Sequence, residues 1–286
     1  MKLERDVLVS SNFLKPNALK ARLEINSGTH QICNQKGYCN DSFHPNLDWQ
    51  LISTNIFNSI SSENSSLLQT DNRKKAKKEN IKAINYSKHI QLIKVPANKL
   101  KLINKKKPFY SESYENYFSF LCSSDYSEHI YPLAKWANQI STDFEKLTIN
   151  PMGCNQGNKN TVTRTRENNI LGLHLDRWDG VKQVDDLSTA SNRICINVGI
   201  QPRYLIFANL SIKKLLNKIS KNKKKNFYPF VMKFFNKYPD YPLFRLKILP
   251  GEAYIAPTEN MIHDGSTLGQ EFLDFHLTMR GVFIID

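Results

Sequence analysis

The stretch Leu171-Gly172-Leu173-His174-Leu175-Asp176-Arg177-Trp178 decides how the rest of the chain is interpreted. Side chains alternate between faces in an extended strand, so His174 and Asp176 share one face. An imidazole and a carboxylate side by side supply two ligands of a 2-His-1-carboxylate metal site. His263, 89 residues after His174, is the candidate for the third ligand. Because only a folded barrel or sandwich closes that separation, the stretch predicts fold and site together.

Composition indicates a globular protein with a sizeable core. The chain has 286 residues, of which 40% are hydrophobic and 11% aromatic, and this length suits one elaborated domain. No apolar run is long enough to cross a bilayer, and residues 1–6 lack the apolar core of a signal peptide. We therefore expect a soluble cytoplasmic protein with no membrane partner. The five scattered cysteines argue against a disulfide scaffold; they are Cys33, Cys39, Cys122, Cys154 and Cys195.

The net charge of +14 has two interpretations. It is typical of proteins that bind nucleic acid or an acidic substrate. The lysines, however, lie in blocks beside Asn and Ser, at residues 73–78, 99–107 and 213–225. Such blocks are more often solvated loops and helix faces, which is the interpretation we favour.

A second group of metal-ligand residue types lies near the N-terminus. His30, Cys33, Cys39 and His44 follow the pattern H-x2-C-x5-C-x4-H, and two thiolates with two imidazoles can bind structural zinc. The spacing matches no zinc motif known to us, so an ordinary polar segment is favoured over a zinc site.

Hydrophobic periodicity predicts helices and strands in the first half of the chain. Residues 57–80 are polar and charged and predict a mobile loop. Residues 90–95 alternate as a strand, and residues 110–146 carry an apolar stripe at helical spacing. Residues 1–150 are thus expected to form a buttress of helices and strands.

Short strands dominate the second half. They are predicted at 161–166, at the His174 segment, and at 193–200, 203–208, 243–249, 252–256 and 272–285, with turns between them. Residues 210–237 interrupt this series as a basic amphipathic helical insertion. The fold class is therefore mainly β with flanking helices (α+β), with an antiparallel jelly-roll core over 151–286 and a single domain over 1–286.

The order of motifs resembles a known enzyme family. His174-x-Asp176 is followed by strands, by a strand led by Pro250-Gly251, by His263-Asp264-Gly265, and by a strand carrying Arg280. This order resembles the iron(II)- and 2-oxoglutarate-dependent dioxygenases, whose double-stranded β-helix, a cupin-like jelly roll, holds an HxD…H triad. The resemblance covers about the last 120 residues. It implies that His174, Asp176 and His263 bind Fe(II), leaving positions for 2-oxoglutarate and O2.

The resemblance also implies a clamp for the co-substrate. Arg280 is the candidate for the far carboxylate of 2-oxoglutarate, since a guanidinium meets a carboxylate with two parallel hydrogen bonds. Thr278 shares its face and is expected to add a hydroxyl. Arg193 and Asn197 alternate together on another strand and remain alternatives for the carboxylate.

Three further residues are expected to line the substrate side. Arg177 and Trp178 follow the HxD motif, where family members place substrate-facing residues. His276 is expected to be a hydrogen-bonding wall of the site, and it replaces His263 as ligand if that assignment fails. Asp264 is expected to form a turn with Gly265 instead of binding metal. Because Asp176 keeps the carboxylate that halogenating relatives lack, the pattern favours hydroxylation.

The resemblance implies hydroxylation of an unactivated C–H bond, coupled to oxidative decarboxylation of 2-oxoglutarate to succinate and CO2. The favoured substrate is an amino acid, a peptide or a related small metabolite, as in natural-product tailoring. The alternatives are an oxygenase acting on protein or nucleic acid and a non-enzymatic basic nucleic-acid-binding protein. Nucleic-acid demethylases of the family carry a second Arg six residues after the co-substrate Arg, where this chain has Asp286. A cupin-like enzyme without 2-oxoglutarate would need another His near His174, and that segment has none.

Overall fold

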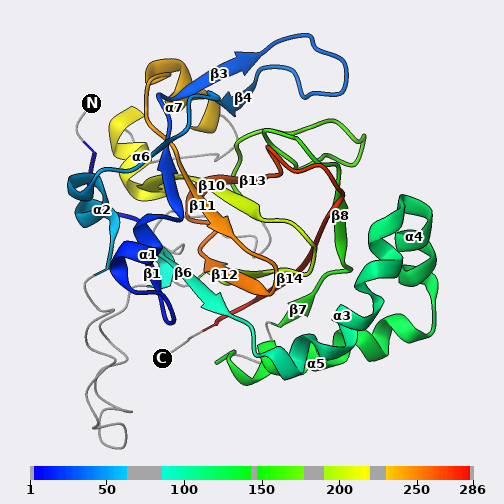
Figure 1. The fold of residues 1–286 in the computed structure, drawn as a ribbon. Helices are drawn as coiled ribbons and strands as arrows, with labels where there is room; N and C mark the ends of the chain where they lie inside the picture. The colour runs from blue at the N-terminus through cyan, green and yellow to red at the C-terminus, as the bar shows by residue number, and fades with distance from the viewer. Residues whose placement is uncertain (1–2, 63–85, 143–146, 177–189, 220–229, 284–286) are drawn as a thin grey trace, which may run out of the picture.

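The computed structural model describes residues 3–62, 86–142, 147–176, 190–219 and 230–283 (Figure 1). Within them, strands form two large sheets and a hairpin. The first sheet has the order β1 (Leu8–Ser11), β6 (His89–Lys94), β12 (Glu252–Ala256), β9 (Asn192–Asn197), β14 (Asp274–Gly281) and β7 (Thr148–Ile149), with β8 (Gly153–Asn155) also paired to β14. The second has the order β13 (Met261–Ser266), β10 (Arg203–Ser211), β11 (Phe244–Ile248), β2 (Leu23–Ile25) and β5 (Gln50–Leu51). Strands β3 (Thr29–Ile32) and β4 (Ser42–Pro45) pair as the hairpin.

Helices cover the outer faces of these sheets (Figure 1). Helices α3 (Ala97–Glu112), α4 (Tyr114–Cys122) and α5 (Asp125–Gln139) lie at one side. Helices α6 (Ile212–Ile219) and α7 (Phe230–Lys237) lie near the end of the second sheet. The short helices α1 (Pro16–Lys20), α2 (Thr54–Ile60) and the 3-10 turn Tyr86–Lys88 complete the described elements.

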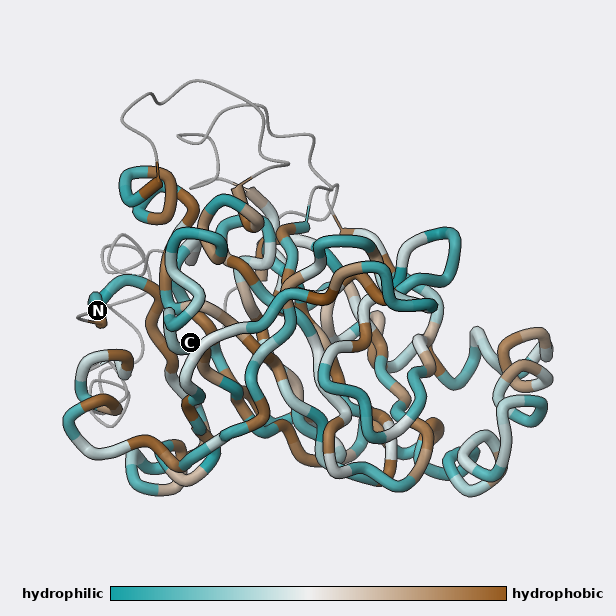
Figure 2. The backbone as a smooth tube through the Cα atoms, turned by 90° about the horizontal axis from the view of Figure 1, so that it is seen from above, coloured by the Kyte–Doolittle hydropathy of each residue, from teal (hydrophilic) through white to brown (hydrophobic). Residues whose placement is uncertain are grey.

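Three apolar clusters hold the layers together. One lies between the two sheets and joins Leu92 and Tyr254 of the first sheet to Leu205 and Phe244 of the second. Another joins the outer face of the first sheet to α3, α4 and α5, and the third joins the second sheet to α6 and α7. Figure 2 shows the corresponding hydrophobic stretches running through the middle of the molecule. Burial of this apolar surface is the main term that stabilises the layers.

The structure confirms most of the strands and helices that periodicity predicts. The predicted strands at 90–95, 193–200, 203–208, 243–249, 252–256 and 272–285 correspond to β6, β9, β10, β11, β12 and β14. The helical stripe over 110–146 corresponds to α4 and α5, and the insertion at 210–237 contains α6 and α7. The helical region begins with α3 at Ala97, earlier than the predicted start at residue 110.

Two strand predictions are wrong. Residues 161–166 form no strand, because Asp264 accepts hydrogen bonds from the backbone N–H and the hydroxyl of Thr163, and these replace ladder partners. The His174 segment makes only one isolated bridge, to His263, since Gly172 turns the chain at a φ of 76°. In the predicted loop at 57–80, residues 57–60 belong to α2, and residues 63–80 lie outside the described ones.

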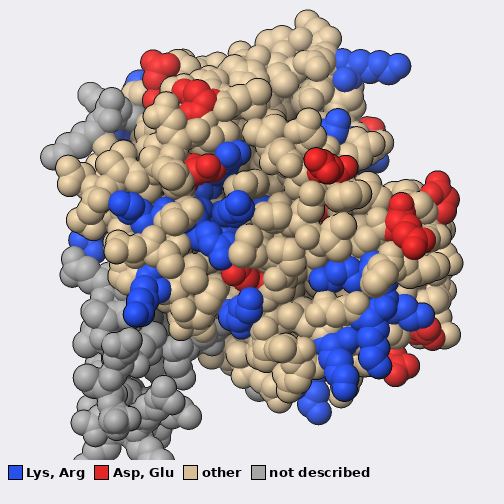
Figure 3. Space-filling view, in the orientation of Figure 1, with Lys and Arg blue, Asp and Glu red and all other residues tan. Residues whose placement is uncertain are grey.

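The basic residues are spread over the surface among acidic ones. Figure 3 shows Lys and Arg gathered over several parts of one face, with Asp and Glu beside them. Lys106 pairs with Asp125 at 3.0 Å, and Lys218 pairs with Glu4 at 2.5 Å. In the part of the chain that the structure describes, no helix has the length and apolar character needed to cross a membrane.

Candidate functional site

The predicted triad comes together at one end of the space between the sheets. His174 and His263 exchange backbone hydrogen bonds of 3.1 and 2.9 Å, which places their rings 4.6 Å apart. Asp176 lies 3.7 Å from Nε2 of His174 and 3.6 Å from Nε2 of His263. The three ligand atoms lie within 4.8 Å of one another, and no other such group occurs among the described residues. This separation fits one metal ion bound by all three side chains.

The two imidazoles are oriented by their own backbone. Nδ1 of His174 lies 2.9 Å from the carbonyl oxygen of Gly172, and Nδ1 of His263 lies 3.2 Å from that of Met261. A carbonyl oxygen only accepts, so each Nδ1 carries the proton and each Nε2 presents its lone pair. Nε2 of His263 is buried without a hydrogen-bond partner among the described residues. A buried nitrogen with an unused lone pair is what a metal ligand requires, and the residues therefore fit a metal.

Electrostatics favour the metal-binding protonation states. Burial lowers the pKa of His263 to about 3, so its ring is neutral at physiological pH. Burial alone would raise the pKa of Asp176, but nearby positive charge, that of Arg193 first and Arg280 with it, holds the pKa well below its usual range. His263 and Asp176 are thus held as a neutral imidazole and an ionised carboxylate, the forms in which these groups bind metal.

Two arginines hold the carboxylate of the triad. Nη2 of Arg280 lies 2.5 Å from Oδ2 of Asp176, and Nη2 of Arg193 lies 3.2 Å from the same oxygen. Strands β9 and β14 place Arg193 and Arg280 directly opposite each other. The Arg280 guanidinium also lies 3.6 Å from Glu259. Arg280, predicted as a clamp for the far end of the co-substrate, therefore lies against the metal ligand itself.

Strand β14 has the two faces that its alternation predicts. Phe275, Leu277 and Met279 pack in the cluster under helices α3 to α5. Arg280 and Thr278 face the other way, and the Thr278 hydroxyl accepts a hydrogen bond of 3.0 Å from Asn150. Thr278 is thus placed on the same face as Arg280, one step further along the strand.

The remaining predicted residues lie elsewhere. The Asn197 amide donates to the carbonyls of Gln201 and Ile248, so backbone groups occupy it. His276 lies 3.4 Å from Asp274 and not with the triad. Arg177 and Trp178 lie outside the described residues.

The alternative zinc group is not assembled. The His44 ring nitrogens lie 2.9 Å from the hydroxyls of Ser42 and Thr161. Cys33 donates to Asp41, and the residues His30, Cys33, Cys39 and His44 form no metal-ligand cluster in the described ranges. Asp264, buried beside His174, accepts through Oδ1 from Thr163 and from the N–H of Gly265. The turn predicted at Asp264-Gly265 is wrong, because both residues lie within strand β13.

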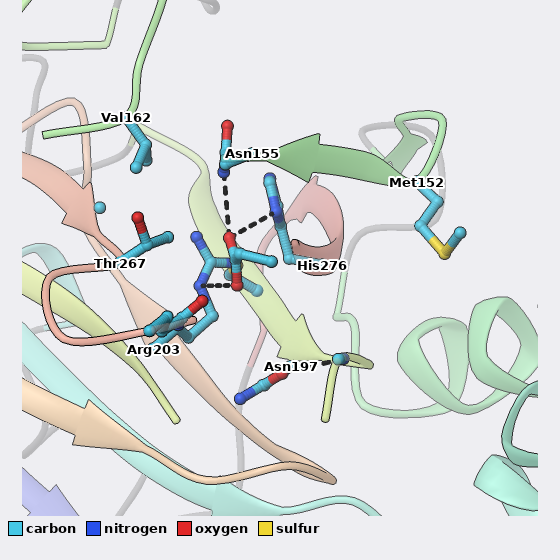
Figure 4. A network of polar contacts seen from close by, with 12 residues as sticks. Met152, Asn155, Val162, Asn197, Arg203, Thr267 and His276 are labelled. Atoms are coloured by element: carbon cyan, nitrogen blue, oxygen red, sulfur yellow. Dashed lines mark hydrogen bonds and ion pairs between the residues drawn. The ribbon is translucent and has the colours of Figure 1, made fainter. Parts of the chain in front are cut away.

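Sequence reasoning missed a second buried polar group further inside. Arg203 begins β10, is 3% exposed, and lies 3.6 Å from Asp274, which accepts from Asn155 and neighbours His276 (Figure 4). The signal was present in the sequence, since Arg203 alternates with Leu205 and Phe207 on an otherwise apolar face. A charged residue in that position predicts a buried partner or ligand.

Comparison with known proteins gives only distant structural similarity. No protein-family model matches the chain, and no curated protein matches it. Among solved structures, the chain is similar to the Kdo hydroxylase KdoO, described as a non-heme Fe(II) alphaketoglutarate dependent dioxygenase. The complex with succinate and Fe(III) has a TM-score of 0.37 at 13% identity, covering 71% of this chain and 82% of that one. The apo structure has a TM-score of 0.37 at 12% identity, and the cobalt(II) complex 0.36 at 13%, both with the same coverage. Similarity at this level does not establish a shared function.

Proposed function

We propose that this protein is an Fe(II)- and 2-oxoglutarate-dependent oxygenase that hydroxylates an unactivated C–H bond. The observation that carries the proposal is the triad of His174, Asp176 and His263, with one Nε2 buried and without a partner. Three ligands on one side of a metal leave coordination positions for a bidentate co-substrate and O2. Iron bound there would supply the oxidation of the C–H bond.

The chain's own residues would hold and orient the reacting groups. His174 and His263 present Nε2 because their Nδ1 protons are fixed by backbone carbonyls. Arg193 and Arg280 fix the Asp176 carboxylate and give the site positive charge that favours an anionic co-substrate. Thr278, next along the same face of β14, would border the co-substrate.

We further propose that the two facing sheets form a double-stranded β-helix core within a single domain. Support comes from the antiparallel pairing of β9, β12 and β14, and of β10, β11 and β13. Strands from the first half of the chain enter both sheets, β1 and β6 in one and β2 and β5 in the other. The 1–150 segment would thus complete the core as well as buttress it.

The substrate class is proposed from the sequence: an amino acid, a peptide or a related small metabolite. Arg177 and Trp178, which follow Asp176 directly, are proposed to border it, and the protein is proposed to act in the cytoplasm. Lysines paired with acidic neighbours, as Lys106 is with Asp125, do not favour nucleic acid as substrate.

Uncoupled turnover tests the function before any substrate is known. Protein reconstituted with Fe(II) and ascorbate should convert 2-oxoglutarate to succinate slowly, and His174→Ala should abolish this conversion. His30→Ala is the matched control, because His30 is exposed and bonds only to Asn46. Succinate formation that persists in His174→Ala, or none in folded iron-loaded protein, would refute the proposal.

A further inference from the structure

We propose that Arg203, and not Arg280, binds the far carboxylate of the co-substrate, an inference that rests on the proposed function. Arg280 already contacts a residue of the metal site. Its Nη2 lies 2.5 Å from Oδ2 of Asp176, and Arg193 approaches the same oxygen. An arginine in contact with a metal ligand meets the end of the co-substrate that chelates the metal, not the opposite end.

The guanidinium of Arg203 lies deeper in the fold than those of Arg193 and Arg280. Cys195 follows Arg193 by two residues on the same face of β9, and it lies opposite Thr278 as Arg193 lies opposite Arg280. Nη1 of Arg203 lies 3.0 Å from Sγ of Cys195. Because two residues advance a strand by about 6.6 Å, the Arg203 guanidinium lies roughly that far inward from the pair at Asp176.

Strand β13 gives the same spacing from the metal ligand. Gly265 follows His263 by two residues, and a Cβ at Gly265 would lie 3.2 Å from Nη2 of Arg203. The absence of a side chain at Gly265 is therefore what lets the guanidinium approach the strand that carries the ligand. An extended five-carbon dicarboxylate separates its carboxyl carbons by about 5 Å, which matches one such step.

The guanidinium of Arg203 has hydrogen-bond donors left for a ligand. Nε of Arg203 lies 3.6 Å from Oδ1 of Asp274, and Nδ1 of His276 lies 3.4 Å from Oδ2, so these buried atoms face one another as ion pairs without closer hydrogen-bond partners among the described residues. Figure 4 shows Arg203, His276 and Asn155 pointing toward one another. At 3.6 Å the contact between Arg203 and Asp274 is longer than a hydrogen bond, so the guanidinium retains donors that a bound anion or water can use. Asp274 faces Nε of Arg203 and the Cys195 thiol faces Nη1, so Nη2, beside Gly265, is the donor left for a carboxylate.

Asp274 is expected to weaken binding of the co-substrate at Arg203. Its carboxylate competes with the co-substrate for Arg203, and burial of Arg203 is tolerated because the two charges compensate. Replacing Asp274 by Asn therefore frees the guanidinium and should strengthen binding of a dicarboxylate. A purely structural ion pair would predict no such gain.

The test compares two ligands that differ only in the far carboxylate. Protein loaded with Co(II) is titrated with 2-oxoglutarate and with 2-oxopentanoate, and the visible Co(II) spectrum reports binding without turnover. Wild type should prefer 2-oxoglutarate by between 10- and 100-fold, the value of hydrogen bonds to a charged group. Arg203→Met combined with Asp274→Asn should remove this preference while leaving 2-oxopentanoate affinity unchanged.

Two variants keep the test decisive. Asp274→Asn alone retains Arg203 and should bind 2-oxoglutarate several-fold more tightly, with 2-oxopentanoate unaffected. Arg280→Met should change the affinities for both ligands alike, because Arg280 acts at Asp176. The proposal is overturned if the double variant keeps the preference, if Arg280→Met removes it, or if Asp274→Asn fails to strengthen binding. Wild type that binds Co(II) and neither oxo acid would refute the proposed function as well.

Discussion

At the scale of single residues, the site is built from charged side chains that contact partners of opposite charge. Asp176 contacts both the metal position and the two arginines, whereas His174 faces the metal position through Nε2 and Asp264 through Nδ1. His174, Asp176 and His263 were predictable because the HxD spacing places two metal-ligand side chains on one face of an extended segment, and a distant His can complete the site. The alternation of Arg203 with Leu205 and Phe207 indicates a buried charge, but no local pattern identifies its partner Asp274, which lies 71 residues away.

This double role of Asp176 has a measurable effect on stability. In metal-free protein, Asp176→Asn removes the counter-charge of Arg193 and one counter-charge of Arg280, which keeps Glu259, and this should cost about 3–5 kcal/mol. His174→Ala removes no buried charge pair and should cost less, although both variants lose metal binding. Urea unfolding in the presence of a chelator measures the two values, and equal losses would contradict the role assigned to Asp176.

At the scale of elements, alternation predicted the strands that carry apolar residues on a face, such as β12 and β14. It failed at residues 161–166, where the polar alternation is real but the Asp264 side chain supplies the hydrogen bonds of a ladder partner. The His174 segment also forms no regular strand, and its backbone is held by one bridge and by the turn at Gly172. Side-chain hydrogen bonds of this kind depend on residues about 100 positions apart, which periodicity does not register.

The turn at Gly172 should therefore matter to the metal site although it contributes no ligand. Its φ of 76° favours glycine, and a Cβ there would lie 2.6 Å from the carbonyl oxygen of Phe43. Gly172→Ala should displace His174 and weaken metal affinity at least 10-fold. Gly37→Ala is a matched control, because Gly37 also has a positive φ but its Cβ would meet nothing within 4 Å. Calorimetric metal titration that gives equal affinities for both variants would count against this account.

At the scale of the whole molecule, composition predicted a globular chain but not how its two halves combine. Strand β1 pairs in parallel with β6 across about 80 residues, and β2 joins β11 across more than 200. Such pairings depend on the packed core and leave no local trace in sequence. The three apolar clusters each draw on residues from both halves, so the site is supported by the entire described fold.

As the pH is lowered, this fold should begin to lose stability at pH values above those at which carboxylates titrate. Burial lowers the pKa of His44 and of His89 to about 4 from an unfolded value of 6.5. Between these values the unfolded chain binds more protons, so stability falls as pH falls, by up to about 1.4 kcal/mol per pH unit for each group. Urea unfolding of metal-free protein from pH 7 to 5 should show this slope, and His44→Gln should reduce it. A stability that stays constant over that range would contradict the buried neutral state.

The most direct test of the central claim is the visible absorption of the anaerobic Fe(II) protein on addition of 2-oxoglutarate. Chelation of iron by the 2-oxo acid produces a weak metal-to-ligand charge-transfer band, which requires metal and co-substrate at one site. We predict that the band appears in the parent protein, survives in His30→Ala and is lost in His174→Ala. No band in folded, iron-loaded protein would contradict the account and favour metal chemistry without 2-oxoglutarate.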